Sequence, residues 1–142
     1  MRRSALLLAV AAGTALALSG CTANSVLDLA VGDCLNTTDL EGTEVSSVEA
    51  LECSTEHDAE IFAEHTFSGD EYPGLETVQE ESDVACRDAF GDFVGIPYEE
   101  SALYFSALYP TEDTWDSADD RTTLCIILAE EPMTESLEGA AI

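Results

Sequence analysis

A serine, a histidine and several acids stand close together in the stretch Cys53-Ser54-Thr55-Glu56-His57-Asp58-Ala59-Glu60. These residue types could support nucleophilic catalysis, or His57, Asp58 and Glu60 could bind a metal ion. Neither pattern is complete. The serine has no Gly-x-Ser-x-Gly elbow, and the second histidine, His65, lies eight residues away along an expected strand. We therefore expect no catalytic residue and no metal ligand, and we interpret both histidines as structural.

A second acidic stretch runs from Glu112 to Asp120 and invites comparison with calcium-binding loops. It lacks the glycine and the bidentate glutamate that an EF-hand places at its sixth and twelfth positions. Weak divalent binding is one interpretation of this stretch, and a solvated helix face is the alternative. Arg121, which follows this stretch, is expected to pair with Asp119, Asp120 or a nearby carboxylate. Arg87 is expected to form an ion pair on its own helix, as Arg121 does beside its strand.

Three aromatic side chains could belong to a partner surface or to the core. Aromatic residues dominate binding hot spots, so Tyr104, Tyr109 and Trp115 could anchor a partner. The same residues suit a packed core equally well. The sequence names no small-molecule ligand and no cofactor.

Five cysteines divide between two chemistries. Leu18-Ser19-Gly20-Cys21 follows a basic start and an apolar run, and it resembles the lipobox of bacterial lipoproteins. Residues 1–20 are thus expected to be a signal peptide, and Cys21 to carry a lipid that holds the chain at the outer face of the cytoplasmic membrane. The apolar run is too short and too alanine-rich for a comfortable membrane span.

Four cysteines remain after Cys21, an even number that predicts two disulfides in an exported chain. They allow three pairings. We expect Cys34–Cys53 and Cys86–Cys125, which would contribute about 3 and about 4 kcal/mol in the chain-entropy model. The sequence contains no Cys-x-x-Cys pair, so the cysteine spacing does not favour a zinc site.

The charge balance excludes some partners. The whole chain carries a formal charge of −26. After Cys21 only two arginines face thirty carboxylates, so the formal charge there is −28, and no lysine is present. Nucleic acid and anionic lipid headgroups would be repelled.

Periodicity indicates the elements that must position these residues. An apolar stripe at spacings of three and four predicts a long helix over 75–94, and Thr111 is placed to cap a second, short helix. Five segments are expected to form strands: 30–35, 44–53, 59–67, 103–109 and 122–128. The last is apolar throughout and is therefore expected to be central.

These elements predict one α+β domain over 30–129, with a small, mostly antiparallel sheet packed on one long helix, a second short helix and two disulfides. Residues 21–29 are expected to be a lipidated tether, and residues 130–142 a loose polar tail.

Several landmarks in this order resemble the septum-formation (Septum_form) family of actinobacterial lipoproteins and membrane proteins. They are Val31-Gly32-Asp33-Cys34, Cys53-Ser54, His57-Asp58-Ala59-Glu60-Ile61, Tyr72-Pro73-Gly74, Cys86, Phe93-Val94-Gly95, Tyr109-Pro110-Thr111-Glu112, Trp115, Arg121-Thr122-Thr123 and Cys125. They span residues 31–128, and one departure is Glu56, where the pattern leads us to expect proline.

The resemblance implies a role at the cell envelope linked to septum formation, without a known reaction. We therefore expect a lipid-anchored, non-enzymatic binding or scaffold protein whose partners are envelope or division proteins. The alternatives are an acidic, cation-responsive envelope module and a small hydrolase built around His57.

Overall fold

The structure is a computed structural model that describes residues 24–42, 45 and 47–142. The two longest strands, of 10 and 12 residues, and the two α-helices form most of the regular structure, and shorter strands and 3-10 helices (η) make up the rest. The elements in order are β1 (Asn24–Ser25), η1 (Val26–Asp28), β2 (Cys34–Leu35), η2 (Thr37–Leu40), β3 (Ser47–Val48), β4 (His57–Thr66), α1 (Leu75–Val94), η3 (Tyr98–Glu100), β5 (Tyr104–Leu108), α2 (Glu112–Ala118) and β6 (Thr122–Met133).

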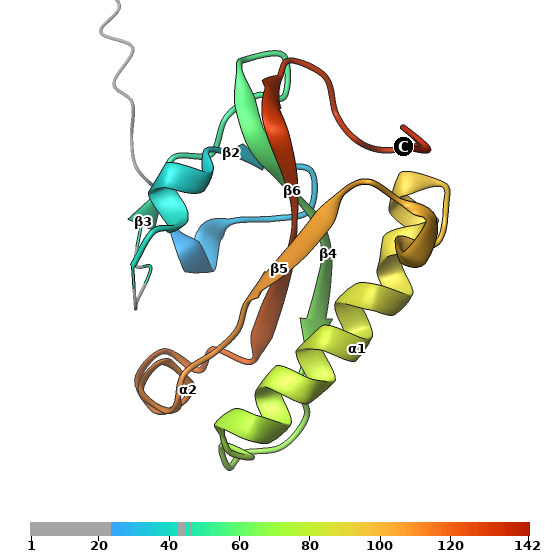
Figure 1. Ribbon diagram of the computed structural model, residues 1–142. Helices are drawn as coiled ribbons and strands as arrows, with labels where there is room; N and C mark the ends of the chain where they lie inside the picture. Colours follow the sequence, from blue (N-terminus) through green and yellow to red (C-terminus); the bar gives the residue numbers. More distant parts are fainter. Residues whose placement is uncertain (1–23, 43–44, 46) are drawn as a thin grey trace, which may run out of the picture.

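Four strands form one antiparallel sheet in the order β2-β4-β6-β5 (Figure 1). The central strand β6 pairs with β4 and β5, as its continuous apolar run predicted. Strands β1 and β3 pair with each other in a separate two-stranded sheet. An antiparallel sheet packed on one long helix, with a second short helix, confirms the predicted α+β fold.

Helix α1 has the predicted bounds, Leu75–Val94. Its buried stripe consists of Val78, Ser82, Cys86, Phe90 and Val94. Leu75, which the pattern also placed on this stripe, is 53% exposed because it begins the helix beyond the packed stretch. The helix ends at Gly95, which takes a left-handed φ of 95° that glycine adopts without steric cost.

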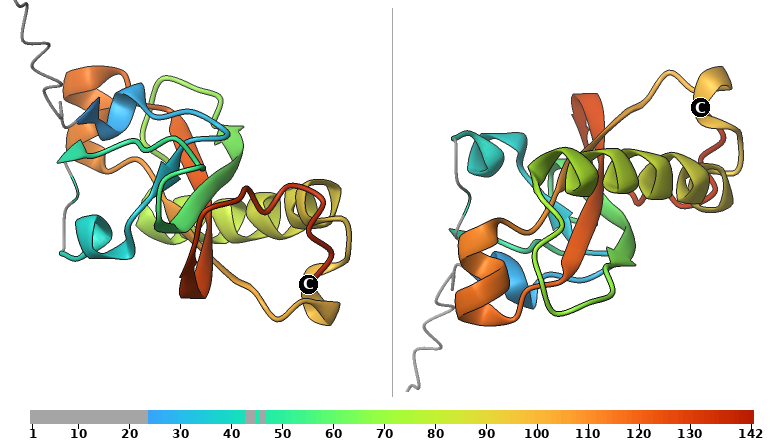
Figure 2. Two further views of the ribbon diagram at one scale, coloured as in Figure 1. Left: turned by 90° about the horizontal axis from the view of Figure 1, so that it is seen from above. Right: turned by 90° about the horizontal axis from the view of Figure 1, so that it is seen from below.

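Both faces of the sheet are covered. Helix α1 packs on one face around a cluster that includes Phe62, Phe90, Cys125 and Ile127. The N-terminal segment covers the other face with Leu29 and Val48, among others. Figure 2 shows this segment, in blue and cyan, away from α1. A third, smaller cluster around Trp115 joins α2 to the start of α1.

A register shift between Ile61 and Ala63 changes which side chains β4 buries on each face. Strict alternation along a strand would place Ile61 and Ala63 on the same face. Instead, Ile61 packs in the cluster away from α1, while Phe62 and Ala63 both pack in the cluster beneath α1. A bulge inserts one extra residue and so breaks strict alternation. This explains why both faces of β4 are apolar around Phe62.

The first two predicted strands are shorter than expected. Only Cys34–Leu35 of the predicted 30–35 strand joins the sheet, because Gly32 turns the chain with a φ of 94°. Of the predicted 44–53 strand, Ser47–Val48 pairs with β1, and Leu51 forms an isolated bridge with Cys34.

The segments at both ends of the predicted domain are packed against it. Residues 24–29, expected within the tether, form β1 and η1, and Leu29 is buried on the sheet. Residues 130–142 were expected to be a loose polar tail. Strand β6 instead continues to Met133, Leu137 is 4% exposed, and the Gly139 N–H donates to Phe93 O at 2.8 Å. Leu137, with the partly buried Met133 and Ala140, packs against the cluster beneath α1, and backbone hydrogen bonds also hold this otherwise polar segment.

The disulfides pair as predicted, Cys34 with Cys53 and Cys86 with Cys125. Their Cα–Cα distances are 5.2 and 5.4 Å, within the range that a disulfide requires. The predicted lipidation site, Cys21, lies outside the described residues. No helix in the described part of the chain is long and apolar enough to span a membrane.

Candidate functional site

A groove of about 820 Å³ lies on the sheet face opposite α1. We call it the anchor-side groove because residues 25–29 of its first wall follow the predicted lipidation site, Cys21, in the sequence. That wall comprises Ser25, Val26, Leu27, Leu29, Leu40, Gly42 and Val45. The sheet contributes Glu64, Ala107, Leu108, Tyr109, Thr122 and Leu124. The α2 region contributes Thr111, Asp113, Thr114, Ala118, Asp119, Asp120 and Arg121.

The floor of the groove is a single row of side chains across three strands. Glu64 on β4 pairs in register with Leu124 on β6, which pairs with Leu108 on β5. Side chains directly opposite one another in a sheet share a face. Two leucines therefore form an apolar floor, and the exposed Glu64 carboxylate stands at its edge.

Helix α2 forms one wall, and a capping box fixes where it begins. The Thr111 hydroxyl accepts from the Thr114 N–H at 3.1 Å, and the Thr111 N–H donates to Thr114 Oγ1 at 3.0 Å. Such reciprocal bonds satisfy backbone donors that a helix start leaves free. The sequence predicted this role for Thr111.

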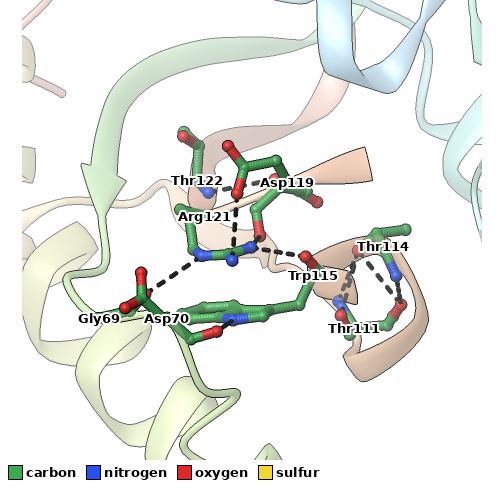
Figure 3. Close-up of polar contacts among 9 residues, drawn as sticks. Gly69, Asp70, Thr111, Thr114, Trp115, Asp119, Arg121 and Thr122 are labelled. Carbon is green, nitrogen blue, oxygen red and sulfur yellow. Dashed lines mark hydrogen bonds and ion pairs between the residues drawn. The ribbon is translucent and has the colours of Figure 1, made fainter. Parts of the chain in front are cut away.

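Arg121 and Trp115 join α2 to the sheet at the end of the groove (Figure 3). The Arg121 guanidinium carbon lies 4.0 Å from the centroid of the Trp115 ring, a cation–π contact. Arg121 Nη1 also donates to the Trp115 carbonyl at 2.7 Å, and Nη2 pairs with Asp119 Oδ1 at 3.1 Å. Arg121 thus pairs with Asp119 as predicted and holds the turn into β6.

The other side of Trp115 is closed by the loop before α1. The indole N–H donates to Asp70 O at 3.1 Å, and the Tyr72 ring packs edge-on at 5.6 Å between centroids. Desolvation raises the pKa of the Tyr72 phenol, and the negative charge of Glu112 raises it further. Trp115 itself is 1% exposed, so it acts as core and cannot be a surface anchor.

The other two aromatic candidates remain accessible. Tyr109 lines the groove half-buried, and its hydroxyl accepts from Gln79 Nε2 at 2.7 Å. Tyr104, on the edge strand β5, is 58% exposed. Of the three predicted anchors, only Tyr109 therefore reaches the anchor-side groove.

The acidic stretch also lines a second, shallow hollow on the outside of α2, which shares Asp113 with the groove. The hollow measures about 410 Å³ and is lined by Glu112, Asp113, Asp116 and Ser117. All four residues are exposed to solvent. This part of the stretch is therefore a helix face exposed to solvent, as the alternative interpretation predicted.

Arg87 lies on α1, far along the chain from the groove residues, and is engaged locally. Its guanidinium lies 3.1 Å from Glu99 and 3.7 Å from Asp83, and it stacks 4.8 Å from the Tyr98 ring centroid. A backbone hydrogen bond, followed by the hydrogen bond from Arg87, lowers the pKa of the Glu99 carboxyl. The predicted ion pair is confirmed.

His57 lies at the opposite end of the sheet and is fully buried. Its Nδ1 lies 2.7 Å from the Thr55 carbonyl oxygen, while Nε2 is buried without a hydrogen-bond partner. Because a carbonyl only accepts, Nδ1 carries the proton. This hydrogen bond to the backbone agrees with the interpretation of His57 as a structural histidine.

The residues near His57 separate into two groups. Asp58 turns away and accepts from the Thr37 N–H at 2.6 Å and hydroxyl at 2.8 Å. Glu60 is 1% exposed and lies with His57, Cys34 and Cys53, such that one ligand atom from each lies within 4.8 Å of the others. We call these four residues the buried polar cluster.

His65 does not belong to the buried polar cluster. It packs edge-on against Phe67, 4.8 Å between ring centroids, and its Nε2 is also buried without a partner. His65 is half-buried, which agrees with its interpretation as a structural histidine.

Two features of these sites were not predicted from the sequence. The first is the N-terminal wall of the groove, because residues 24–29 read as a tether. The second is the contact of the C-terminal segment with Glu60, through the Ser136 hydroxyl and the Leu137 N–H, each at 2.7 Å. Leu137, which stands between the polar residues Ser136 and Glu138, was the available signal.

Comparison with known proteins identifies a family and nothing closer. A family profile described as "Septum formation" matches residues 31–140. The match includes both disulfides, the buried polar cluster and most of the C-terminal segment. No curated protein and no solved structure shows significant similarity to the chain.

Proposed function

Because this chain belongs to the septum-formation family, we propose that it is a lipid-anchored, non-enzymatic scaffold of the cell envelope. In this proposal the anchor-side groove binds a segment of a division-linked protein that carries basic and apolar residues. The observation that carries the proposal is the groove itself, which combines an apolar floor with carboxylates at its rim.

Charge complementarity defines the chemistry of the partner. Glu64, Asp113, Asp119 and Asp120 line the groove, and Arg121 is already paired with Asp119. A basic segment would be attracted to this rim and also to the acidic surface of the whole chain. Apolar side chains of the same segment would cover Leu108 and Leu124.

The position of the groove suits a partner at the membrane. Ser25, Val26 and Leu27 line it, and β1 begins at Asn24, three residues after Cys21. A lipid on Cys21 would hold the groove within a few residues' reach of the bilayer surface, since an extended residue spans at most about 3.6 Å. The partner segment would then be a membrane-proximal part of an envelope protein.

The surroundings of His57 support a non-enzymatic role. A general base must reach the proton that it abstracts. The His57 ring is 0% exposed, and its Nδ1 is held by the Thr55 carbonyl. The hydrolase alternative therefore has little support.

The proposal is tested in dividing cells with the full chain. Glu64→Lys/Asp113→Lys reverses two exposed charges of the groove, and Asp88→Lys/Asp92→Lys makes the same change on the exposed face of α1. We expect the native chain and the α1 variant to concentrate at the septum and to crosslink to the same division proteins. The groove variant should lose these neighbours by at least about tenfold, because like charges would now face each other.

Each alternative result has a distinct meaning. If the groove variant keeps its neighbours, the groove is not the binding surface. If the native chain spreads evenly over the membrane without division proteins, the link to septum formation fails. Cys21→Ser should release the chain from the membrane, and continued anchoring of this variant would overturn the lipid anchor.

A second candidate function, a cation-responsive module, draws on the hollow outside α2. Three carboxylates, those of Glu112, Asp113 and Asp116, line it. If it binds calcium, millimolar Ca²⁺ should raise Tm well above the effect of Na⁺ at equal ionic strength. Equal shifts would indicate screening of self-repulsion alone.

A further inference from the structure

We propose that the buried polar cluster is a redox-gated site for a zinc-like divalent cation. When the Cys34–Cys53 disulfide is intact, the sulfurs are bonded to each other and the site is closed. When the disulfide is reduced, two thiolates join His57 and Glu60 as the four ligands of the metal.

The strand register brings these ligands together. Cys34 on β2 pairs directly with Glu60 on β4, and Cys53 Sγ lies 3.9 Å from Glu60 Oε1. A ligand atom from each of the four cluster residues lies within 4.8 Å of the other three. Two sulfurs, a nitrogen and an oxygen form a donor set that suits tetrahedral Zn²⁺.

His57 is oriented as a metal-binding histidine would be. The Thr55 carbonyl holds one ring nitrogen as its hydrogen-bond partner, and the other ring nitrogen is buried without one. Ligating histidines commonly donate their second N–H to a backbone carbonyl, which fixes the ring. An unpartnered buried nitrogen is costly unless something binds it, and a cation would do so.

Glu60 is a buried carboxylate without a basic partner. The Ser136 hydroxyl and the Leu137 N–H donate to its two oxygens. Arg87 and Arg121, the basic residues that follow Cys21, pair with other residues instead. A bound cation would neutralise this charge, since buried charges are normally paired or coordinate a metal.

Exposure indicates which sulfur a reductant reaches. Cys34 is fully buried, but Cys53 is half-buried and therefore accessible. A dithiol reductant would attack Cys53 through its thiolate and form a mixed disulfide. Its second thiol then completes the exchange. The reductant becomes a disulfide, and its two electrons break the Cys34–Cys53 bond. Its two protons are transferred to the two sulfurs, so that Cys34 and Cys53 become thiols.

Metal binding completes the cycle without a further reactant. The two thiols each lose a proton as they bind Zn²⁺, and the neutral His57 nitrogen and the Glu60 carboxylate supply the remaining ligands. Two thiolates at about 2.3 Å from the metal lie roughly 3.8 Å apart. Side-chain rotation at the half-buried Cys53 can supply this separation. A disulfide oxidant would reverse the change. It accepts two electrons from the two thiolates and two protons from solvent and becomes a dithiol, while the Cys34–Cys53 bond re-forms and Zn²⁺ is released.

The first experiment uses the full chain and needs no variant. The oxidised chain is treated with a limited amount of dithiol, alkylated and mapped by mass spectrometry. We expect Cys34 and Cys53 to be labelled before Cys86 and Cys125, which are both 0% exposed. Zn²⁺ added before alkylation should protect Cys34 and Cys53. Earlier labelling of the other pair, or no protection by Zn²⁺, would overturn the proposal.

The second experiment counts and identifies the bound metal. The reduced chain should bind one Zn²⁺, and Co²⁺ in its place should show thiolate charge-transfer bands with tetrahedral visible bands. The oxidised chain should show neither. Equal Zn²⁺ binding by oxidised and reduced chains would mean that surface carboxylates bind the metal, which contradicts a redox-gated site.

Matched variants then assign the ligands. His57→Ala and Glu60→Gln should each weaken Zn²⁺ binding by more than about 100-fold, because even the loss of an outer partner costs 10–100-fold. The neighbouring His65→Ala and Glu64→Gln should leave it unchanged. If the two sets behave alike, the cluster is not the site. The Co²⁺ spectrum of the native chain still decides the outcome if His57→Ala fails to fold.

Discussion

The two disulfides join the same sheet to very different surroundings. Cys86–Cys125 connects α1 to the central strand β6 inside the apolar cluster that also contains Phe62 and Phe90. Cys34–Cys53 lies at the end of the sheet beside His57 and Glu60, and Cys53 is half-buried. The first bond is surrounded by groups that only pack. The second is surrounded by groups that can accept protons or bind a cation.

This difference shows that one bond type serves two purposes in a small domain. A disulfide in an apolar core stabilises the fold and remains inert, because no reductant reaches it and no ligand neighbours it. A disulfide among polar groups also controls what those groups can bind.

Leu137 links the two regions. Its side chain packs in the cluster with Cys86 and Cys125, while its N–H donates to Glu60. The C-terminal segment therefore contacts the surroundings of both disulfides. Substitutions along it can separate the contributions of the two regions to stability.

Removing each disulfide should have the largest effects. Cys86→Ala/Cys125→Ala is expected to lower the free energy of unfolding by about 4 kcal/mol, and Cys34→Ala/Cys53→Ala by about 3 kcal/mol, because the longer closed loop restricts the unfolded chain more. The sequence separations are 39 and 19 residues. Urea unfolding measures both, and a larger loss for the second pair would reverse the comparison.

Truncating the Leu137 side chain, which links the two regions, should cause the next largest loss of stability. Leu137→Ala is expected to cost about 3 kcal/mol, as for other buried leucines. Ile142→Ala, at a side chain that is 54% exposed, serves as the control and should change stability by less than about 0.5 kcal/mol. Similar losses for the two variants would show that the C-terminal segment is not held by Leu137.

Removing the acceptor at the polar end should cost less. Glu60→Ala leaves the Leu137 N–H without its partner and is expected to cost about 2 kcal/mol, whereas Glu60→Gln keeps an acceptor and should cost about 1 kcal/mol. Hydrogen exchange of the Leu137 amide should accelerate strongly in the alanine variant only. Equal exchange in both variants would mean that Glu60 does not hold this segment.

The smallest effect should come from the exposed charges beside the core disulfide. The pKa of Glu99 is lowered, first by its backbone hydrogen bond and then by Arg87. A lowered folded-state pKa contributes stability at neutral pH, and this contribution is lost as pH falls through that pKa. An NMR titration should place Glu99 below its ordinary value. In Arg87→Gln the pKa should rise only part of the way, and a full return would assign the whole shift to Arg87.

Patterns that depend on near neighbours predicted the elements well. The stripe on α1, the cap at Thr111 and the apolar run of β6 are local signals, and each led to the correct element. The bulge at Phe62 and the short strands β2 and β3 were not predicted, because register depends on what the opposite strand presents.

The candidate sites were harder to predict than the elements. His57 and Glu60 stood out by residue type, but the sequence joined them to Asp58, which instead binds Thr37. Cross-strand pairing and the return of the C-terminal segment decide which neighbours they have. Neither is visible in a stretch of eight residues.

By itself, the sequence determined the acidic charge, the cysteine count, the helix and strand periodicities and the landmarks of the family, because each of these is a property of residue types and short spacings. Only the tertiary structure decided that residues 24–29 form a wall of the groove, that Leu137 is buried, and that Cys34, Cys53, His57 and Glu60 share one buried space. The physical reason is that burial and ligand geometry arise from contacts between distant segments, and these contacts form only when the sheet is assembled.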